Sequence, residues 1–180
     1  MTKRHEYSLD LSNIDHYDPP LTAARLQLRT AQPTDAYALA ELMIKAYRGT
    51  IDYDGETLED AIGEVQAYLT EKRGGRPLLN ESRLAFVGPL LVGACLAGDW
   101  HERQLPLIAY VMTHAEWKNR GVGRHMLCAV LQALREQNYR EVRAVITEGN
   151  VPSERLFGRM GFQKVSNTVA APPTDEYIDS

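Results

Sequence analysis

The segment EWKNRGVGRHML, residues 116–127, constrains the fold more than any other stretch of this sequence. The run before it, LPLIAYVMTH at 105–114, is short and apolar, which is typical of a buried strand. After it, apolar residues recur with the helical period from Val122 to about Asn138. The chain therefore passes from a strand through a glycine-containing turn directly into a helix.

The entrance of this predicted helix concentrates positive charge, although the whole chain has a formal net charge of −4. Lys118, Arg120 and Arg124 all lie there. The first N–H groups of a helix lack backbone partners, and the helix dipole makes that end positive. Gly121 and Gly123 have no Cβ atoms that would keep a ligand away from those donors. Such a turn suits a phosphate or a pyrophosphate.

The other patterns predict a mixed sheet with helices on both faces. The predicted elements, in chain order, are a strand at 25–29, a helix starting near Pro33, a helix after Thr57, strands at 82–88, 90–98 and 105–114, the helix described above, a strand at 141–147, a short helix within 150–162 and a last strand, FQKV. This order contains neither internal repeats nor an interior linker. It fits one domain of the α/β or α+β class.

The two ends of the chain show no clear period. Residues 1–24 contain the break YDPP, and we expect them to form an extended arm. Residues 169–180 are rich in proline and then acidic, so a loose tail is expected. The folded domain is therefore predicted at 25–168.

The composition argues against several classes of protein. No apolar run reaches the ~18–20 residues of a membrane span, and the first residues lack the apolar core of a signal peptide. We therefore expect a cytoplasmic protein without a membrane partner. No basic stripe extends beyond the turn, which argues against nucleic acid. The five histidines and two cysteines show no metal-ligand spacing, so no metal is expected, and Cys95 and Cys128 are predicted to be buried thiols.

Three kinds of phosphate-binding turn compete for the glycine segment. A P-loop requires G-x-x-x-x-G-K-[ST], which the chain lacks. A dinucleotide fingerprint requires a third glycine where Met126 stands, and an acidic residue that ends a strand, whereas Glu141 begins one. The third is a coenzyme A turn, which holds a pyrophosphate between a strand and a helix. A dinucleotide module is kept as an alternative, to be separated by competition between CoA and NAD.

Two segments resemble one known family. KNRGVGRHML resembles the [QR]-x-x-G-x-[GA] signature of the GNAT acyltransferases, and NVPSERLFGRMGF is similar to their N-x-x-[AS]-x-x-[LF]-Y-x-x-x-G-F segment. The spacing and the element order agree from about Leu26 to Val165. The resemblance implies a GNAT fold, with a mostly antiparallel sheet and splayed central strands. It also implies an acetyl-CoA-dependent N-acetyltransferase that moves the acyl group directly to an amine.

The resemblance also implies a set of cofactor-binding residues. The strand before the signature would bond the pantetheine arm, and the N–H groups of residues 120–124 would bind the pyrophosphate. Asn150 would meet the arm near the thioester, which makes it the candidate catalytic residue. The complete predicted set is Val111, Met112, Thr113, Lys118, Asn119, Arg120, Gly121, Val122, Gly123, Arg124, Asn150 and Phe157.

Two residues depart from the family pattern. Lys118 stands where Gln or Arg is usual, so it keeps the charge and loses the planar fork. Phe157 stands where a tyrosine is proposed to protonate the departing CoA thiolate, and a lost general acid costs ~10²–10⁴-fold in rate. Tyr110, Tyr139, Ser153 or water are the replacement donors considered. The alternative function is a non-catalytic acyl-CoA-binding or sensing domain of the same fold.

The acceptor side is less defined by the sequence. The base candidates are Asp99, Glu102, His114, Glu116 and Glu148. Asp52, Asp54 and Glu56 either attract a cationic amine or form a solvated loop. The acceptor is expected to be a small-molecule or peptide amine, and a homodimer is possible because dimers are common in the family. The family usually closes its sheet with one more strand after Val165, an edge that the 1–24 arm is the other candidate to supply.

Overall fold

The computed structural model describes residues 2–14, 25–73 and 75–166. One mixed sheet forms its centre, with strand order β2-β4-β5-β6-β7-β1-β8 and with β3 paired to β5. The strands are β1 (Arg4–Asp10), β2 (Gln27–Thr30), β3 (Arg76–Pro77), β4 (Arg83–Val87), β5 (Leu90–Trp100), β6 (Leu105–Thr113), β7 (Glu141–Thr147) and β8 (Gln163–Lys164). Only the β6–β7 pair is parallel among the described strands, which confirms the predicted, mostly antiparallel sheet. The predicted 169–180 tail lies outside the described residues.

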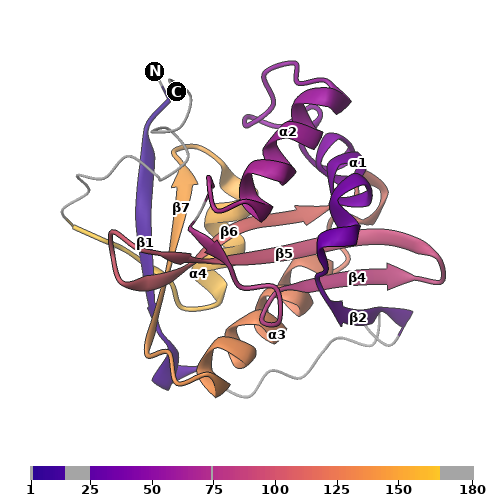
Figure 1. Ribbon diagram of the computed structural model, residues 1–180. Helices are drawn as coiled ribbons and strands as arrows, with labels where there is room; N and C mark the ends of the chain where they lie inside the picture. The colour runs from indigo at the N-terminus through magenta and orange to yellow at the C-terminus, as the bar shows by residue number, and fades with distance from the viewer. Residues whose placement is uncertain (1, 15–24, 74, 167–180) are drawn as a thin grey trace.

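Helices cover both faces of the sheet, as predicted (Figure 1). The helices are α1 (Ala36–Tyr47), α2 (Leu58–Leu69), α3 (Val122–Glu136) and α4 (Val151–Arg159). Alternate residues of β5 pack on opposite sides: Ala94 and Leu96 lie with α1 and α2, whereas Cys95 and Ala97 lie with α3. Because β5 is buried on both faces, its sequence is a continuous apolar run. No helix in the described part of the chain is long and apolar enough to cross a membrane.

The first strand is the main difference from the sequence prediction. Residues 4–10 of the expected arm pair with β7 along its whole length, from Arg4↔Thr147 to Asp10↔Glu141. The two-residue β8 pairs with the other side of β1, and Leu9 is buried in the core beside α3. Residues 4–10 therefore belong to the sheet, where they take the place that a strand after Val165 would fill. The YDPP stretch lies outside the described residues.

The two strands at the centre of the sheet separate soon after they meet. β6 and β7 pair only at Leu107↔Arg143 and Ile108↔Ala144. Beyond these pairs β6 stays on β5 as far as Thr113, and β7 stays on β1 as far as Thr147. Figure 1 shows the ends of the two strands pointing in different directions. We call this divergence the splay, and it confirms the predicted splayed central strands.

Candidate active site

The β6 side of the splay offers unpaired backbone groups. The N–H of His114 donates to the carbonyl of Val92 in β5, with 2.8 Å between N and O. Successive residues of a strand direct their N–H and C=O groups to alternate sides, so those of Thr113 and Val111 point away from β5. Met112 directs its groups toward β5, and its side chain is buried beneath α1 and α2. Of the three residues predicted to bond the pantetheine arm, Val111 and Thr113 therefore direct backbone groups into the splay, and Met112 does not.

The N-terminus of α3 lies next to these groups. Gly121 is the N-cap, with φ of 79°, a left-handed conformation that favours glycine. Gly123 lies in the first turn. A Cβ atom added to it would lie 3.5 Å from Leu156 Cδ2, 3.6 Å from Thr113 Oγ1 and 3.8 Å from Val111 Cγ1. The bare Cα of Gly123 thus faces the end of the splay, as a turn that accepts a pyrophosphate requires.

The basic side chains predicted to lie together at the entrance of α3 make different contacts in the structure. The ammonium of Lys118 donates to the carbonyl oxygen of Ala46 at 2.6 Å, and burial lowers the pKa of Lys118. This carbonyl belongs to the last turn of α1, where helix carbonyls lack intrahelical partners. The guanidinium carbon of Arg120 lies 4.9 Å from the ring centre of Trp117. Asn119 and Arg124 are exposed, and Asn119 has φ of 61°. A role of these side chains in pyrophosphate binding stays a prediction.

The contact of Lys118 leads to a prediction with two readouts. We expect Lys118→Met to lower the free energy of unfolding by about 1 kcal/mol, because a charged donor to the end of α1 is lost from a partly exposed position. The dissociation constant for acetyl-CoA is expected to change less than about threefold. Urea unfolding and calorimetric titration measure the two effects. Unchanged stability with an affinity for the cofactor about tenfold weaker would instead assign Lys118 to the pyrophosphate.

Asn150, which follows β7, contacts the loop between α1 and α2. It caps α4, because its Oδ1 accepts from the N–H of Ser153 at 3.2 Å. Its Nδ2 donates to Oδ2 of Asp52 at 2.6 Å. The neighbouring Ile51 also reaches this point, since its Cδ1 would lie 3.6 Å from a Cβ added to Gly149. Asn150 thus has a structural role as an N-cap, and its contact with Asp52 was not predicted.

Phe157 is part of the core in the structure. It is 5% exposed, and its ring packs edge-to-face against Phe162 with 5.0 Å between the centroids. Of the replacement acids, Ser153 lies in the first turn of α4 beside Asn150. The hydroxyl of Tyr110 donates to Glu64. Tyr139 follows the C-terminus of α3, roughly 20 Å along the helix from Gly121.

The five base candidates separate into two groups. Asp99 lies near the end of β5 and Glu102 lies in the turn between β5 and β6, about 25 Å along β6 from its exit. Asp99 pairs there with Arg76. His114 and Glu116 follow β6, and Glu148 follows β7, so these three lie at the ends of the diverging strands. The structure brings the backbone of these three residues to the ends of the diverging strands, with the carboxylate of Glu148 3.5 Å from Nε2 of His5 in β1, and leaves the first two away from the splay.

Glu64 was missed by the sequence analysis. One of its carboxylate oxygens accepts from the hydroxyl of Tyr110, and the other accepts from Nε of Arg73 at 3.1 Å. Burial and then the charge of Glu64 raise the pKa of Tyr110. Burial and then the charges of Asp52 and Glu64 raise the pKa of Tyr47. Both carboxylates therefore act on the same region beside α1 and β6. The sequence gives only a helical position for Glu64, because its partner lies 46 residues away.

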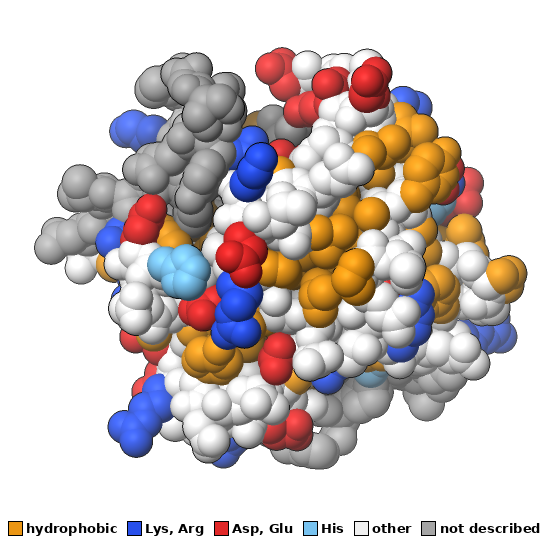
Figure 2. All heavy atoms as spheres, in the orientation of Figure 1, with side chains coloured by type: hydrophobic (Ala, Val, Ile, Leu, Met, Phe, Trp, Pro, Cys, Tyr) orange, Lys and Arg blue, Asp and Glu red, His pale blue; other side chains and the backbone are white. Residues whose placement is uncertain are grey.

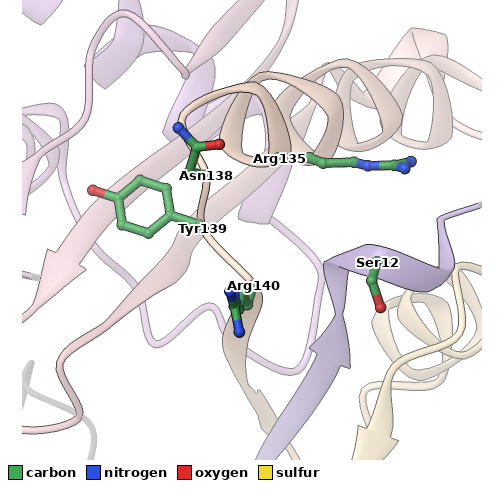
Figure 3. A pocket seen from close by; sticks show the side chains of 5 residues that line it. All are labelled: Ser12, Arg135, Asn138, Tyr139 and Arg140. Atoms are coloured by element: carbon green, nitrogen blue, oxygen red, sulfur yellow. The ribbon is translucent and has the colours of Figure 1, made fainter.

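A separate hollow lies at the other end of α3 (Figure 3). It is lined by Ser12, Arg135, Asn138, Tyr139 and Arg140. The labelled side chains diverge, with Tyr139 and Arg135 pointing in opposite directions. Because nothing converges there and the splay lies at the far end of α3, we do not assign this hollow to the active site. Within the described ranges, no group of three or more His, Cys, Asp or Glu residues is placed to hold a metal ion.

Solved structures share this fold. A GCN5-related N-acetyltransferase from Sphaerobacter thermophilus is 20% identical with a TM-score of 0.69, over 91% of this chain and 49% of that chain. This chain thus spans about half the length of that protein. A putative acetyltransferase from Salmonella typhimurium, solved with its cofactor acetyl-CoA, is 19% identical with a TM-score of 0.58, over 77% and 80% of the two chains.

A third similar structure is an aminoglycoside N-acetyltransferase, AAC(6')-Iy, in complex with CoA. It is 13% identical with a TM-score of 0.59, over 81% of this chain and 93% of that chain. A comparison with curated proteins gives no match. The family model described as an acetyltransferase (GNAT) domain matches residues 25–163, which include both arms of the splay and the glycine turn. The chain therefore belongs to the GNAT acetyltransferase family.

Proposed function

We propose that this protein transfers an acetyl group from acetyl-CoA directly to the amine of a small-molecule or peptide acceptor. The observation that carries the proposal is the splay, whose open β6 backbone lies next to the glycine-containing N-terminus of α3. Backbone donors that suit a thioester arm therefore lie next to backbone donors that suit a pyrophosphate. The similar Salmonella structure, which was solved with its cofactor acetyl-CoA, supports this donor.

Different residues would bind different parts of acetyl-CoA. Val111 and Thr113 offer backbone groups along the arm, and the N–H groups of residues 120–124 offer donors to the phosphates. Asn150 presents its side-chain amide from the β7 side. These contacts fix the acyl carbon while the acceptor approaches from the side of α1 and α2. Holding both reactants in this way removes much of the entropic barrier to their reaction.

The transfer needs no covalent intermediate on the protein. The amine nitrogen bonds to the acyl carbon, the carbon–sulfur bond breaks, the sulfur keeps the electron pair, and the nitrogen loses its proton. The negative charge on the acyl oxygen develops beside β6, where a strand N–H stabilises it. Among the described residues, His114, Glu116 and Glu148 lie at the ends of the splay, where a base is required.

A small-molecule acceptor is the first to test, since one of the similar structures is an aminoglycoside N-acetyltransferase. The first experiment is calorimetric titration with acetyl-CoA, CoA and NAD. We expect micromolar binding of the two CoA species and none of NAD. Thiol release from acetyl-CoA is then measured with an amine library, and release that depends on an amine is expected. If neither CoA species binds, the proposed function is wrong.

A second candidate function is a non-catalytic acyl-CoA-binding domain. The position of Phe157 favours it, because a buried phenylalanine has no proton to give to a leaving thiolate. In that case the protein binds acetyl-CoA and releases no thiol with any amine in the library. The same two measurements therefore separate the candidates.

A further inference from the structure

Tyr110 lies where β6 and β7 begin to separate. The last pair between these strands is Ile108↔Ala144, and Tyr110 follows shortly after it in β6. Because side chains alternate along a strand, the side chain of Tyr110 points to the same face as that of Met112, toward α1 and α2. The acceptor of the proposed function approaches from this face. The hydroxyl of Tyr110 is therefore on the acceptor side of the splay.

This hydroxyl is connected to solvent through Glu64 of α2. It donates to one carboxylate oxygen of Glu64. The other oxygen accepts from Nε of Arg73 at 3.1 Å, so the carboxylate is held from both sides. The side chain of Glu64 is 29% exposed and can exchange protons with water. A hydrogen-bonded path thus leads from β6 at the splay to the surface of α2.

Packing fixes the ring of Tyr110. The ring of Tyr68 meets it edge-to-face, with 5.8 Å between the centroids. Tyr68 is buried, and its hydroxyl donates to the carbonyl of Ala97 at 2.7 Å. Burial and then the charge of Glu64 raise the pKa of Tyr110, so its hydroxyl stays protonated. A hydroxyl has one donor and two acceptor positions, and no group in the described part of the chain donates to the oxygen of Tyr110. This oxygen can therefore accept a proton.

The base candidates at the ends of the diverging strands fit this role less well. Nδ1 of His114 accepts from the N–H of Glu116 at 3.2 Å, so in the neutral ring the proton is on Nε2 and neither nitrogen has a free lone pair. The carboxylate of Glu148 lies 3.5 Å from Nε2 of His5.

The charge distribution also favours a proton that leaves toward α2. Figure 2 shows acidic side chains gathered over the loop between α1 and α2, at the top of the view. The charge of Asp52 in this loop acts together with that of Glu64 on Tyr47, at the end of α1. Negative potential on this side of the splay attracts the positive charge that develops on the amine.

We propose that Tyr110 and Glu64 form the path by which the proton leaves the acceptor amine, an inference that rests on the proposed function. As the amine nitrogen bonds to the acyl carbon, its proton passes to the oxygen of Tyr110. The original hydroxyl proton of Tyr110 passes to Glu64, which gives it to water. The carbon–sulfur bond then breaks and the sulfur keeps the electron pair. Tyr110 is thus the catalytic residue, and Glu64 acts through it.

Tyr110→Phe tests the path, because it keeps the ring against Tyr68 and removes only the hydroxyl. The acceptor is the amine of the library that gives the fastest thiol release. We expect kcat to fall about 100-fold or more, since acid–base catalysis contributes ~10²–10⁴-fold in rate. The KM for the amine and the dissociation constant for acetyl-CoA are expected to stay within about threefold. Tyr68→Phe is the matched control, and its kcat is expected to stay within about threefold of the wild-type value.

Rescue by a small acid anion separates proton transfer from a structural role. Glu64→Ala opens a partly exposed space beside the hydroxyl of Tyr110. Formate is expected to restore part of the kcat that Glu64→Ala loses, because its carboxylate takes the proton from Tyr110. The double variant Tyr110→Phe with Glu64→Ala is expected to gain nothing from formate, since the hydroxyl that passes the proton is missing. Circular dichroism checks that each variant is folded.

The outcomes separate this inference from the function on which it rests. Failure of the wild-type protein to bind acetyl-CoA, or to release thiol with any amine, overturns the proposed function and the proton path with it. Turnover by the wild-type protein with an equal kcat in Tyr110→Phe overturns the proton path alone. Equal losses in Tyr110→Phe and Tyr68→Phe, or equal rescue of the single and the double variant by formate, also overturn the path alone.

Discussion

Glu6→Gln is expected to lower the free energy of unfolding by about 3 kcal/mol, because it removes a buried carboxylate that two arginines share. Glu6 is 2% exposed. Its Oε1 accepts from Arg143 at 2.5 Å, and its two oxygens accept from Arg103 at 3.2 and 3.1 Å. The expected loss is at the lower end for a buried ion pair, because the side chains of Arg103 and Arg143 are 32% and 18% exposed and can reach water.

This network joins three segments that are distant in the sequence. Glu6 lies in β1, Arg103 in the turn between β5 and β6, and Arg143 in β7. The measurement is urea unfolding at equilibrium, followed by circular dichroism. Glu141→Gln is the matched control: Glu141 also contacts Arg143, at 2.7 Å, but it is 35% exposed. A loss under about 1 kcal/mol is therefore expected for it. Equal losses in the two variants would contradict the special role of Glu6.

Gly123→Ala is expected to change stability and cofactor binding in opposite directions. An alanine in the first turn of α3 is a better helix former, so the free energy of unfolding rises by up to about 1 kcal/mol. Its Cβ fits the protein, because the nearest atoms lie 3.5 to 3.8 Å away. The same methyl group occupies the end of the splay, and we expect acetyl-CoA to bind about 30-fold more weakly, in line with the ~1–3 kcal/mol cost of an overfilled site.

Gly121 provides the contrast for this test. Its φ of 79° is a left-handed conformation, in which any side chain strains the backbone by about 1–2 kcal/mol. Gly121→Ala is therefore expected to lose both stability and cofactor affinity. Thermal unfolding and calorimetric titration of the two variants measure both quantities. If Gly123→Ala binds acetyl-CoA as the wild-type protein does, the cofactor does not approach α3 at this turn.

Much of the fold was predictable because it depends on neighbouring residues. The helical period after Val122 and the continuous apolar run of β5 reflect which faces of these elements are buried. Both patterns can be recognised from residues that are close together in the sequence. The helix predicted after Thr57 likewise starts on a local pattern, since Thr57 and Asp60 form a capping box in the structure. The glycine turn was found in the same way, from residues that lie within a few positions of one another, and the structure gives Gly121 a left-handed conformation.

The first strand and the candidate site depend on contacts between distant residues, which local sequence patterns do not predict. Residues 4–10 alternate too weakly to indicate a strand, and their place beside β7 depends on Glu6 finding two arginines that lie 97 and 137 residues away. Phe157 matches a motif position by spacing, yet its direction is set by packing against Phe162. The sequence suggested the basic turn as one cluster, whereas α1 draws Lys118 away through the carbonyl of Ala46.

By itself, the sequence determined the helices, most of the strands, the glycine turn at the entrance of α3 and, through its two motifs, the family. Only the tertiary structure decided which side chains meet: Asp52 with Asn150, Glu64 with Tyr110, and Glu6 with its arginines. The physical reason is the distance along the sequence over which each kind of interaction acts. Helix and turn chemistry acts over a few residues, whereas these contacts join segments whose meeting is fixed by strand register and by the splay of β6 from β7.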